Sequence, residues 1–313
     1  MTKYIPRKIL VTGSLGLIGS SITKYANSHK IKVITHSRRI NEIMESDKKL
    51  ESVYYDLRNA QEITLDTDID TVIHTATSNE NSLKSLSCAL ENTFVGTQNL
   101  LKKCIENGIQ KFVYISTVQL YSQIKNITDE NGEIDFKSIY TKQHYLTEQL
   151  LRIYASEFRE GINILRVANV FSDSNYALSK RNNLVPTCFI KNGFDSNKII
   201  LNTNGQQRRN FIHDSSVGEI CIKTLTKDGP ILKIINVASG YSPSIIDIAK
   251  MVQLEFSNYG HNREIELGAN EIAEIYTPNF TTQYYEQPSM LGQKDLMEKS
   301  IKRLIKLEDV RNR

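Results

Sequence analysis

The stretch KILVTGSLGLIGSSI, residues 8–22, places three glycines between an apolar run and a helix-like segment. Gly13 permits a tight turn, Gly16 lets the backbone approach a pyrophosphate, and Gly19 lets the helix pack closely on the strand. The N-terminus of that helix offers amide donors and the positive end of a dipole to phosphates. The spacing GxxGxxG differs from the general GxGxxG fingerprint, and an ordinary glycine-rich turn is the alternative. The setting between strand and helix favours dinucleotide binding. The expected cofactor contacts in this stretch are Gly13, Gly16, Leu17, Ile18 and Gly19.

Short apolar runs and longer helix-like segments alternate through the first half of the chain. The expected strands are 8–12, 30–35, 52–57, 71–75, 111–116 and 163–167, and the expected helices are 18–28, 88–107 and 140–159. Near-continuous apolar strands separated by helices indicate a parallel sheet that is covered on both faces. Because crossovers between parallel strands are right-handed, the pattern predicts an α/β fold with a Rossmann-like doubly wound parallel sheet.

The pattern becomes less regular after residue 169. Residues 173–183 are polar and are expected to form a loop, 198–201 and 210–213 short strands, 244–256 an amphipathic helix, and 294–307 a charged helix. We therefore predict a dinucleotide-binding domain over residues 1–170, to which residues 211–240 return. Residues 171–210 and 241–313 are expected to form a smaller C-terminal substrate-binding domain.

The composition narrows the class of protein. The 313 residues suffice for about two domains. The chain has 39 Lys and Arg against 35 Asp and Glu, a net charge of +4 that no block of like charges concentrates. Nucleic-acid binders usually cluster their positive charge, so we expect no nucleic-acid partner. No apolar run approaches the roughly 18 residues of a membrane span, so we expect no membrane partner either.

The residue types that form disulfides or bind metals show no site pattern. The four cysteines lie far apart and form no CxxC pair, which indicates reduced thiols and no metal site. The apolar stretch 9–11 is too short for a signal peptide, so we expect a cytoplasmic protein. His74 and His213 lie in or beside expected strands, and we interpret them as structural histidines.

The end of the second expected strand bears on the choice between NAD and NADP. An acid there would bind the ribose hydroxyls, whereas an arginine would favour a 2′-phosphate. Residues 35–39 have the sequence THSRR and contain no acid, which locally favours NADP. Solvated arginines, or one that stacks on the adenine, are the alternative. The cofactor contacts expected at the ends of the strands are His36, Ser37, Arg38, Asp56, Leu57, Thr75, Ala76 and Thr77.

A further set of motifs follows along the chain. They are TGSLGLIG at 12–19, STVQLYS at 116–122, YTKQH at 140–144, RVANVFS at 166–172, NL at 183–184, RNFIHDSS at 209–216 and NVASG at 236–240. In this order and spacing they resemble the motifs of the extended short-chain dehydrogenase/reductases, in the branch of nucleotide-sugar epimerases and dehydratases. The resemblance covers about residues 8–255.

That resemblance implies roles for individual residues. It places the catalytic base at Tyr140 and the hydroxyl that holds the substrate oxygen at Thr117. His144 stands where the family has a lysine that binds the nicotinamide ribose, so Tyr140 and His144 are also expected to contact the cofactor. Arg209 matches an arginine that binds the substrate phosphates. The implied substrate contacts are Thr117, Asn169, Asn183, Leu184 and Arg209.

The sequence departs from the family pattern in ways that affect the chemistry. His144 lies one helical turn from Tyr140 on the same face and can still bind the ribose, but histidine is mostly neutral at pH 7. Activation of Tyr140 should then depend more on the positive charge of the nicotinamide. Val118 and Gln119 replace the acid pair that 4,6-dehydratases carry, so we expect no elimination of water. Thr93 replaces a family asparagine.

The resemblance implies an NAD-dependent oxidoreductase that acts at carbon 4 of a nucleotide-activated sugar. We favour a 4-dehydrogenase, with GDP-heptose in capsule polysaccharide biosynthesis as one candidate substrate, over an epimerase or a reductase of a nucleotide sugar. NAD is favoured because this branch mostly keeps NAD bound, and NADP is the alternative. A catalytically inactive dinucleotide-binding sensor is the alternative from another class. Family members pair through two long helices, so we expect a homodimer built on 88–107 and 140–159.

Overall fold

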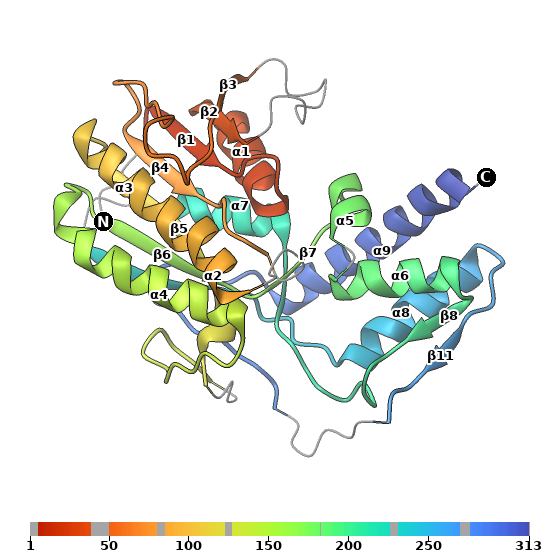
Figure 1. Ribbon diagram of the computed structural model, residues 1–313. Coiled ribbons are helices and arrows are strands. Elements are labelled where there is room, and N and C mark those ends of the chain that lie inside the picture. Colours follow the sequence, from red (N-terminus) through yellow and green to blue (C-terminus); the bar gives the residue numbers. More distant parts are fainter. Residues whose placement is uncertain are drawn as a thin grey trace.

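The computed structural model describes residues 6–38, 50–79, 85–122, 127–181, 183–225, 231–269 and 276–312. Its centre is a seven-stranded parallel sheet in the order β10-β6-β5-β4-β1-β2-β3, which confirms the predicted Rossmann-like fold (Figure 1). The strands are β1 (Lys8–Thr12), β2 (Lys32–Ser37), β3 (Glu51–Tyr54), β4 (Thr71–His74), β5 (Lys111–Thr117), β6 (Ile162–Val167) and β10 (Leu232–Val237).

The strand order reverses beside β1. This strand pairs with β2 on one side and with β4 on the other. In open α/β sheets, ligands bind outside the carboxyl ends of the strands at such a switch point. The glycine loop follows β1 and residues 75–79 follow β4, so both segments begin where a ligand is expected.

Helices cover both faces of the sheet. The helices α1 (Leu17–Ser28) and α7 (Asp214–Lys223) lie on one face, and α2 (Leu86–Ala89), α3 (Gly96–Glu106) and α4 (Ile139–Tyr154) on the other (Figure 1). Side chains alternate along a strand. Ile9 and Val11 of β1 therefore pack with α1 and α7, whereas Leu10 packs with Leu100 of α3 and Leu151 of α4.

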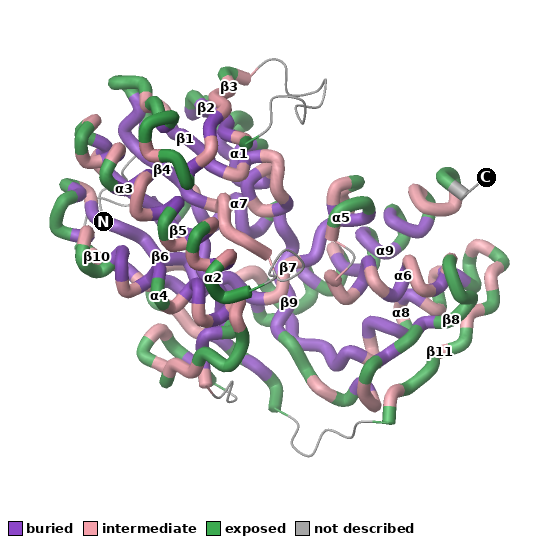
Figure 2. The backbone as a smooth tube through the Cα atoms, viewed as in Figure 1, coloured by how far each residue is buried: buried purple, intermediate pink, exposed green. Residues whose placement is uncertain are grey.

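A smaller lobe lies beyond the carboxyl ends of the strands. It contains α5 (Asn175–Lys180), α6 (Val185–Asp195), α8 (Ile245–Asn258), α9 (Met290–Asn312) and the parallel pair β8 (Lys198–Ile200) and β11 (Glu264–Glu266). Phe189, Ile248, Phe256, Ile301 and Leu304 belong to its own hydrophobic core. Figure 2 shows buried segments at the centre of both lobes. No helix in the described part of the chain is both long and apolar enough to cross a membrane.

One predicted helix is present but contains a π-helical turn, and one predicted loop was wrong. The expected single helix 88–107 is α2 and α3 joined by a π-helical turn, η4 (Leu90–Val95). The expected loop 173–183 contains α5, whose first turn is capped because the Ser174 side chain accepts a hydrogen bond from the amide of Ala177. A hydroxyl cap of this kind satisfies an amide that the helix itself leaves without a partner.

The strands of the second half also differ from expectation. The expected strand 210–213 is β9 (Phe211–His213), and it pairs with β7 (Asn169–Phe171), a strand that was not predicted. The strand 198–201 is β8, and it pairs with β11. Neither α6 nor α7 was predicted from the sequence. Some predicted ends differ from the observed ones by a few residues, since β3 ends at Tyr54 and α9 begins at Met290.

Candidate active site

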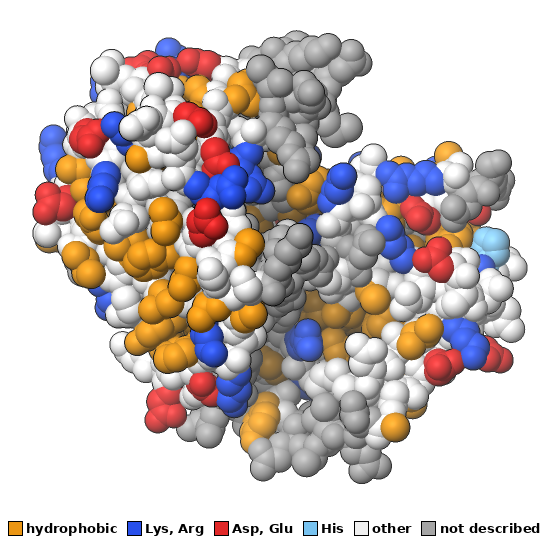
Figure 3. Space-filling model, in the orientation of Figure 1, with side chains coloured by type: hydrophobic (Ala, Val, Ile, Leu, Met, Phe, Trp, Pro, Cys, Tyr) orange, Lys and Arg blue, Asp and Glu red, His pale blue; other side chains and the backbone are white. Residues whose placement is uncertain are grey.

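One cleft of about 940 Å³ lies between the sheet and the smaller lobe, and Figure 3 shows the surface hollowed there. The glycine loop, the carboxyl ends of the strands, the first turns of α4 and parts of the smaller lobe line it. Every candidate site residue named from the sequence lines this cleft: Gly13, Gly16, Leu17, Ile18, Gly19, His36, Ser37, Arg38, Asp56, Leu57, Thr75, Ala76, Thr77, Thr117, Tyr140, His144, Asn169, Asn183, Leu184 and Arg209. The structure thus brings the set together, and the individual roles stay predictions.

The glycine loop leaves no room for a side chain at position 13 or position 19. Gly13 has a φ of +66°, and a Cβ added there would lie 2.9 Å from both the amide nitrogen of Ala76 and Oγ1 of Thr75. A Cβ on Gly19 would overlap the carbonyl group of Gly13. The amide of Gly16 donates to the carbonyl of Gly13 at 2.9 Å, which closes the turn. The loop is a cradle that depends on glycine at 13 and 19.

The first turn of α1 has the properties of a phosphate site. Its N-cap is Gly16, which has no side chain to accept a hydrogen bond from the first amides of the helix. The first turn contains no acidic residue. The first amides of a helix have no partner within the helix, and they carry the positive end of its dipole. The phosphates of a dinucleotide match both the donors and the charge.

The expected adenosine end of the cleft contains one buried histidine and one ion pair. The His36 Nε2 atom lies 2.9 Å from the carbonyl oxygen of Tyr55, and burial lowers the pKa of His36 to about 4. Three hydrogen bonds from the Arg58 guanidinium, at 2.5, 3.0 and 3.0 Å, hold the pKa of Asp56 below its usual range. Arg58 lines the cleft and was not predicted, although it follows Asp56 by two residues. Arg39 lies outside the described residues.

Two other histidines are structural, as predicted. The two ring nitrogens of His74 lie 2.6 Å from the Thr12 hydroxyl and 2.9 Å from the Thr97 hydroxyl, and burial lowers the pKa of His74 to about 3. The His213 side chain accepts a hydrogen bond from the amide of Ser215 and so caps α7. Both rings therefore have local partners.

Thr93 fixes the loop after β4. Its hydroxyl accepts a hydrogen bond from the amide of Ser78 at 3.0 Å and donates to Oε1 of Gln143 at 2.9 Å. The Gln143 amide in turn donates to the Ser78 carbonyl at 2.7 Å. The residue that replaces the family asparagine thus connects α4 to the floor of the cleft.

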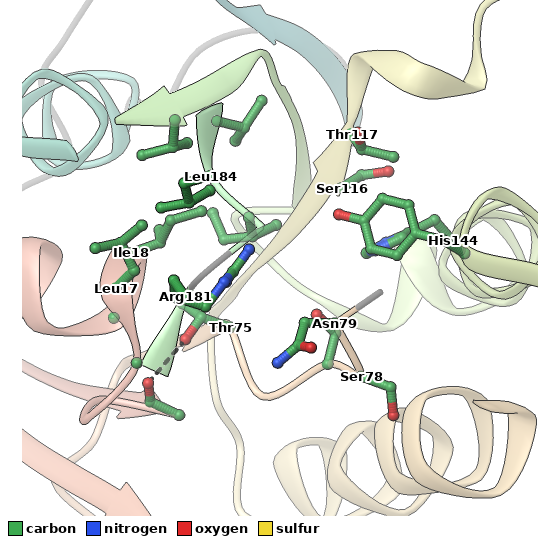
Figure 4. Close-up of a pocket in the computed structure, with 18 of the residues that line it drawn as sticks. Leu17, Ile18, Thr75, Ser78, Asn79, Ser116, Thr117, His144, Arg181 and Leu184 are labelled. Carbon is green, nitrogen blue, oxygen red and sulfur yellow. Dashed lines mark hydrogen bonds between the residues drawn. The ribbon is translucent and has the colours of Figure 1, made fainter. Parts of the chain in front are cut away.

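Thr117, Tyr140 and His144 lie in the same part of the cleft. A capping box at Ser138 begins α4, so Tyr140 lies in its first turn. The ring of Tyr140 packs edge-on against that of His144, with centroids 4.7 Å apart. The hydroxyl oxygen of Thr117 accepts a hydrogen bond from the amide of Gln119 at 3.2 Å, so its proton can be donated to a ligand. Figure 4 shows Thr117 and His144 on the same side of the cleft.

His144 has a partner that the sequence analysis missed. Its Nδ1 atom lies 2.8 Å from the hydroxyl of Tyr114 on β5. Its Nε2 atom is buried and has no hydrogen-bond partner among the described residues. Burial lowers the pKa of His144 to about 3, so the ring is neutral at pH 7, as expected from its residue type.

The residues expected to contact the substrate lie among several cations that line the cleft. Asn169 donates to the carbonyl of Asn210 at 2.9 Å, and Leu184 is the N-cap of α6. Arg209 lines the cleft together with three cations that were not predicted, Lys180, Arg181 and Arg208. Figure 4 shows Arg181 pointing into the cleft. A signal was present in the sequence, because Lys180 and Arg181 lie within three residues of the NL pair and Arg208 directly precedes Arg209.

Comparison with known proteins gives a family model that matches most of this chain, and it gives relatives that act on nucleotide sugars. A family model described as "NAD dependent epimerase/dehydratase family" matches residues 9–238. A dTDP-D-glucose 4,6-dehydratase of Dictyostelium discoideum is 28% identical over 273 residues, which is 79% of this chain and 61% of that protein. A dTDP-4-dehydro-6-deoxy-D-allose reductase of a Streptomyces species is 25% identical over 270 residues, 80% of this chain and 81% of that protein. The chain therefore spans about three-fifths of the Dictyostelium protein's length.

A solved structure shares the fold. The structure of MoeE5 in complex with UDP-glucose and NAD matches this chain with a TM-score of 0.75 and 19% identity. The match covers 98% of this chain and 100% of that one, so it includes the smaller lobe as well as the sheet.

Proposed function

This chain belongs to the NAD dependent epimerase/dehydratase family, and from that premise we propose that it is an NAD-dependent oxidoreductase acting at carbon 4 of a nucleotide-activated sugar. One observation carries the proposal. The hydroxyl, phenol and imidazole of Thr117, Tyr140 and His144 line the same cleft as a glycine cradle and a second set of cations, Lys180, Arg181, Arg208 and Arg209. A sensor would need the cradle but not a base together with a second cationic site.

NAD is the proposed cofactor. The cradle at Gly13 and Gly19 and the uncapped first turn of α1 fit a diphosphate. At the adenosine end, the Asp56 carboxylate holds the Arg58 guanidinium and so reduces the positive charge available to a 2′-phosphate. This pairing supports NAD over NADP, although Arg38 also lines the cleft.

In the proposed reaction, a residue of the chain removes the proton of the sugar hydroxyl, and the cofactor accepts the hydride. Nicotinamide, when bound, supplies the hydride acceptor. Tyr140 removes the proton of the carbon-4 hydroxyl as a general base. Thr117 donates a hydrogen bond to the same oxygen and orients it. Because the neutral His144 adds no charge, activation of Tyr140 is proposed to depend on the positive charge that the bound nicotinamide would supply.

We do not extend the similarity to 4,6-dehydratases to their elimination step. Val118 is buried, and Gln119 lies in the short 3₁₀ helix η5 (Val118–Leu120) at the cleft wall. Neither side chain can supply or accept the proton that loss of water requires, because neither titrates. A 4-dehydrogenase is therefore favoured, and a reductase that runs the same step backwards is the second candidate, supported by the Streptomyces relative.

The substrate is proposed to be a nucleoside diphosphate sugar. Lys180, Arg181, Arg208 and Arg209 all line the cleft, and arginine forks bind phosphate oxygens with charge-assisted hydrogen bonds. GDP-heptose, a precursor of capsule polysaccharide, is the first candidate to test. A cytoplasmic location is proposed because all four cysteines, Cys88, Cys104, Cys188 and Cys221, are free thiols.

A homodimer is proposed on the face formed by α2, η4 and α4. Leu86, Val95, Leu146 and Ile153 are exposed there, and Ile153 has 75% of its surface accessible. Figure 3 shows apolar side chains gathered over this face. Exposed apolar patches of this kind are typical of partner surfaces. Light scattering at micromolar concentration should show a dimer, and a monomer would contradict this part of the proposal.

The experiment that tests the function starts from the purified protein. Denaturation should release NAD, and titration of the native protein with nucleotide sugars should raise the absorbance of reduced nicotinamide. A 4-keto sugar should form in equal amount. Formation of the 4-epimer without net reduction would identify an epimerase instead. A bound dinucleotide that stays oxidised with every nucleotide sugar would support the sensor.

A further inference from the structure

His144 and Tyr114 form a buried pair behind the cleft. Tyr114 is fully buried and His144 has 1% of its surface accessible. Tyr114 contacts His144 at Nδ1, and Tyr140 packs against the other side of the same ring. The remaining ring nitrogen, Nε2, is buried in a residue that lines the cleft and has no partner in the described part of the chain. Leaving a buried polar atom without a hydrogen bond is costly, so Nε2 is suited to a ligand.

The direction of the hydrogen bond between Tyr114 and His144 decides what Nε2 presents to that ligand. A neutral imidazole carries one proton, on one nitrogen or the other. A phenol is a stronger acid than an imidazole N–H, and an imidazole nitrogen is a stronger base than a phenolic oxygen. Tyr114 therefore donates to Nδ1, and the proton of His144 is on Nε2.

Thr147 is the other hydroxyl that interacts with Tyr114. Its own proton is donated to the carbonyl of Gln143 at 2.8 Å, so it could only accept from Tyr114. An alcohol oxygen is a much weaker base than an imidazole nitrogen. Donation from Tyr114 to His144 is thus the more stable arrangement.

The surrounding titratable groups do not favour a second proton on His144. Those that face the pair are Tyr140 and Glu148 on α4 and His74 on β4. The Glu148 carboxylate is paired with Arg166, and burial keeps His74 neutral. His144 therefore stays neutral in this setting.

We propose that Tyr114 is a positioning residue, which holds His144 as the neutral Nε2–H tautomer and so presents an uncharged N–H donor where the family has a lysine. The acceptor would be a hydroxyl oxygen of the dinucleotide ribose, because His144 lines the cleft proposed to hold that cofactor. The identity of this acceptor rests on the proposed function. The tautomer does not, because it depends only on the contact between Tyr114 and His144.

Nitrogen NMR of the protein without added ligand tests the tautomer directly. The chain has six histidines, and ¹⁵N-histidine labelling with a His144→Gln variant assigns the signals of His144. At pH 7 we expect Nε2 to resonate as a protonated nitrogen and Nδ1 as an unprotonated one. A proton on Nδ1, or on both nitrogens, would overturn the proposal, and the wild-type spectrum is sufficient to show it.

Substitution of Tyr114 then tests its positioning role. Tyr114→Phe keeps the ring and should give a mixture of the two tautomers, while Tyr121→Phe, which also removes one buried hydroxyl, should leave His144 unchanged. NADH affinity should fall on the order of threefold to tenfold in Tyr114→Phe only, the scale of one neutral hydrogen bond. An unaltered tautomer in Tyr114→Phe would contradict the role. A wild type that binds no NADH would overturn the proposed function and leave the tautomer assignment supported.

Discussion

Glu148 and Arg166 form a buried ion pair directly beneath the cleft. Arg166 donates from Nε to Oε1 at 3.1 Å and from Nη2 to Oε2 at 2.7 Å, and each side chain is at most 3% exposed. Ser116 donates to the same Oε1 at 2.6 Å, and the guanidinium lies 5.0 Å from the centre of the Tyr121 ring. The pair thereby fixes α4, which carries the proposed base, against β5 and β6.

This geometry predicts a large stability cost when one partner is removed. Glu148→Gln leaves the Arg166 charge buried without its carboxylate, which should lower the free energy of unfolding by about 3–5 kcal/mol. Glu266→Gln breaks an exposed pair with Lys198 and should cost less than about 1 kcal/mol. Urea unfolding of both variants measures the difference. Equal, small losses would show that the buried pair does not hold α4 in place.

The glycine cradle predicts that Gly13→Val abolishes dinucleotide binding. The new side chain would collide with Ala76 and Thr75 in a backbone conformation that valine rarely adopts. Gly108→Val is the matched control, because Gly108 has a φ of +68° but open space around its Cβ position. Calorimetric titration with NAD should show binding to the control only. Binding to both variants would contradict the assignment of the cradle.

The position of Arg209 in the cleft wall, where it is proposed to bind the substrate, predicts a selective effect of Arg209→Ala. Loss of a charge-assisted contact to the substrate diphosphate should weaken nucleotide-sugar binding by about 1.5–3 kcal/mol, with little change for NAD. Arg303→Ala, which removes an exposed arginine of the same lobe that pairs with Asp173, should change neither affinity. If Arg209→Ala weakened both ligands equally, the alignment of this segment with the family motif would be wrong.

Three buried histidines predict how stability depends on pH. Burial lowers the pKa of His36 to about 4 and those of His74 and His144 to about 3, against 6.5 in an unfolded chain. As the pH falls, these histidines therefore take up protons in the unfolded chain before they do so in the folded protein. Their contribution to the free energy of unfolding is complete above pH 6.5, and it decreases as the pH falls from 6.5 towards the pKa values of the folded protein. Each histidine contributes about 1.4 kcal/mol per pH unit in this window.

Urea unfolding between pH 7.5 and pH 5 measures that slope. Stability should be flat above about pH 7 and fall steeply below pH 6.5. His144→Gln should reduce the slope by about one third, because one of the three groups no longer titrates. A profile with no fall between pH 6.5 and pH 5 would mean that these rings are protonated in the folded protein.

Much of the fold could be predicted because its signals are local. The strands β1, β4 and β5 are almost wholly buried and so appear as apolar runs, and Gly13 marks the turn after the first of them. The helix α5 was missed because only Ala177 and Leu178 of its six residues are buried, too few to give an apolar period. The π-helical turn within 88–107 has no sequence signature in the residues themselves.

The site residues that belong to a sequence motif could be predicted. Those that depend on contacts between distant elements could not. All candidate residues line one cleft because the family motifs lie at the carboxyl ends of the strands. The contact between Tyr114 and His144 joins residues 30 positions apart, and that between Glu148 and Arg166 joins a helix to a strand. Spacing along the chain does not reveal which side chains meet across such a distance.

The turnover of Tyr140→Phe, measured as reduction of NAD by the nucleotide sugar that the wild type oxidises, tests the central claim most directly. Phenylalanine keeps the ring against His144 but removes the hydroxyl that is proposed to take the proton. The rate should fall by a factor of about 100 or more, the scale of losing an acid–base group, while NAD affinity and the unfolding midpoint stay near those of the wild type. Wild-type turnover in this variant would contradict the account and return the chain to the class of dinucleotide-binding sensors.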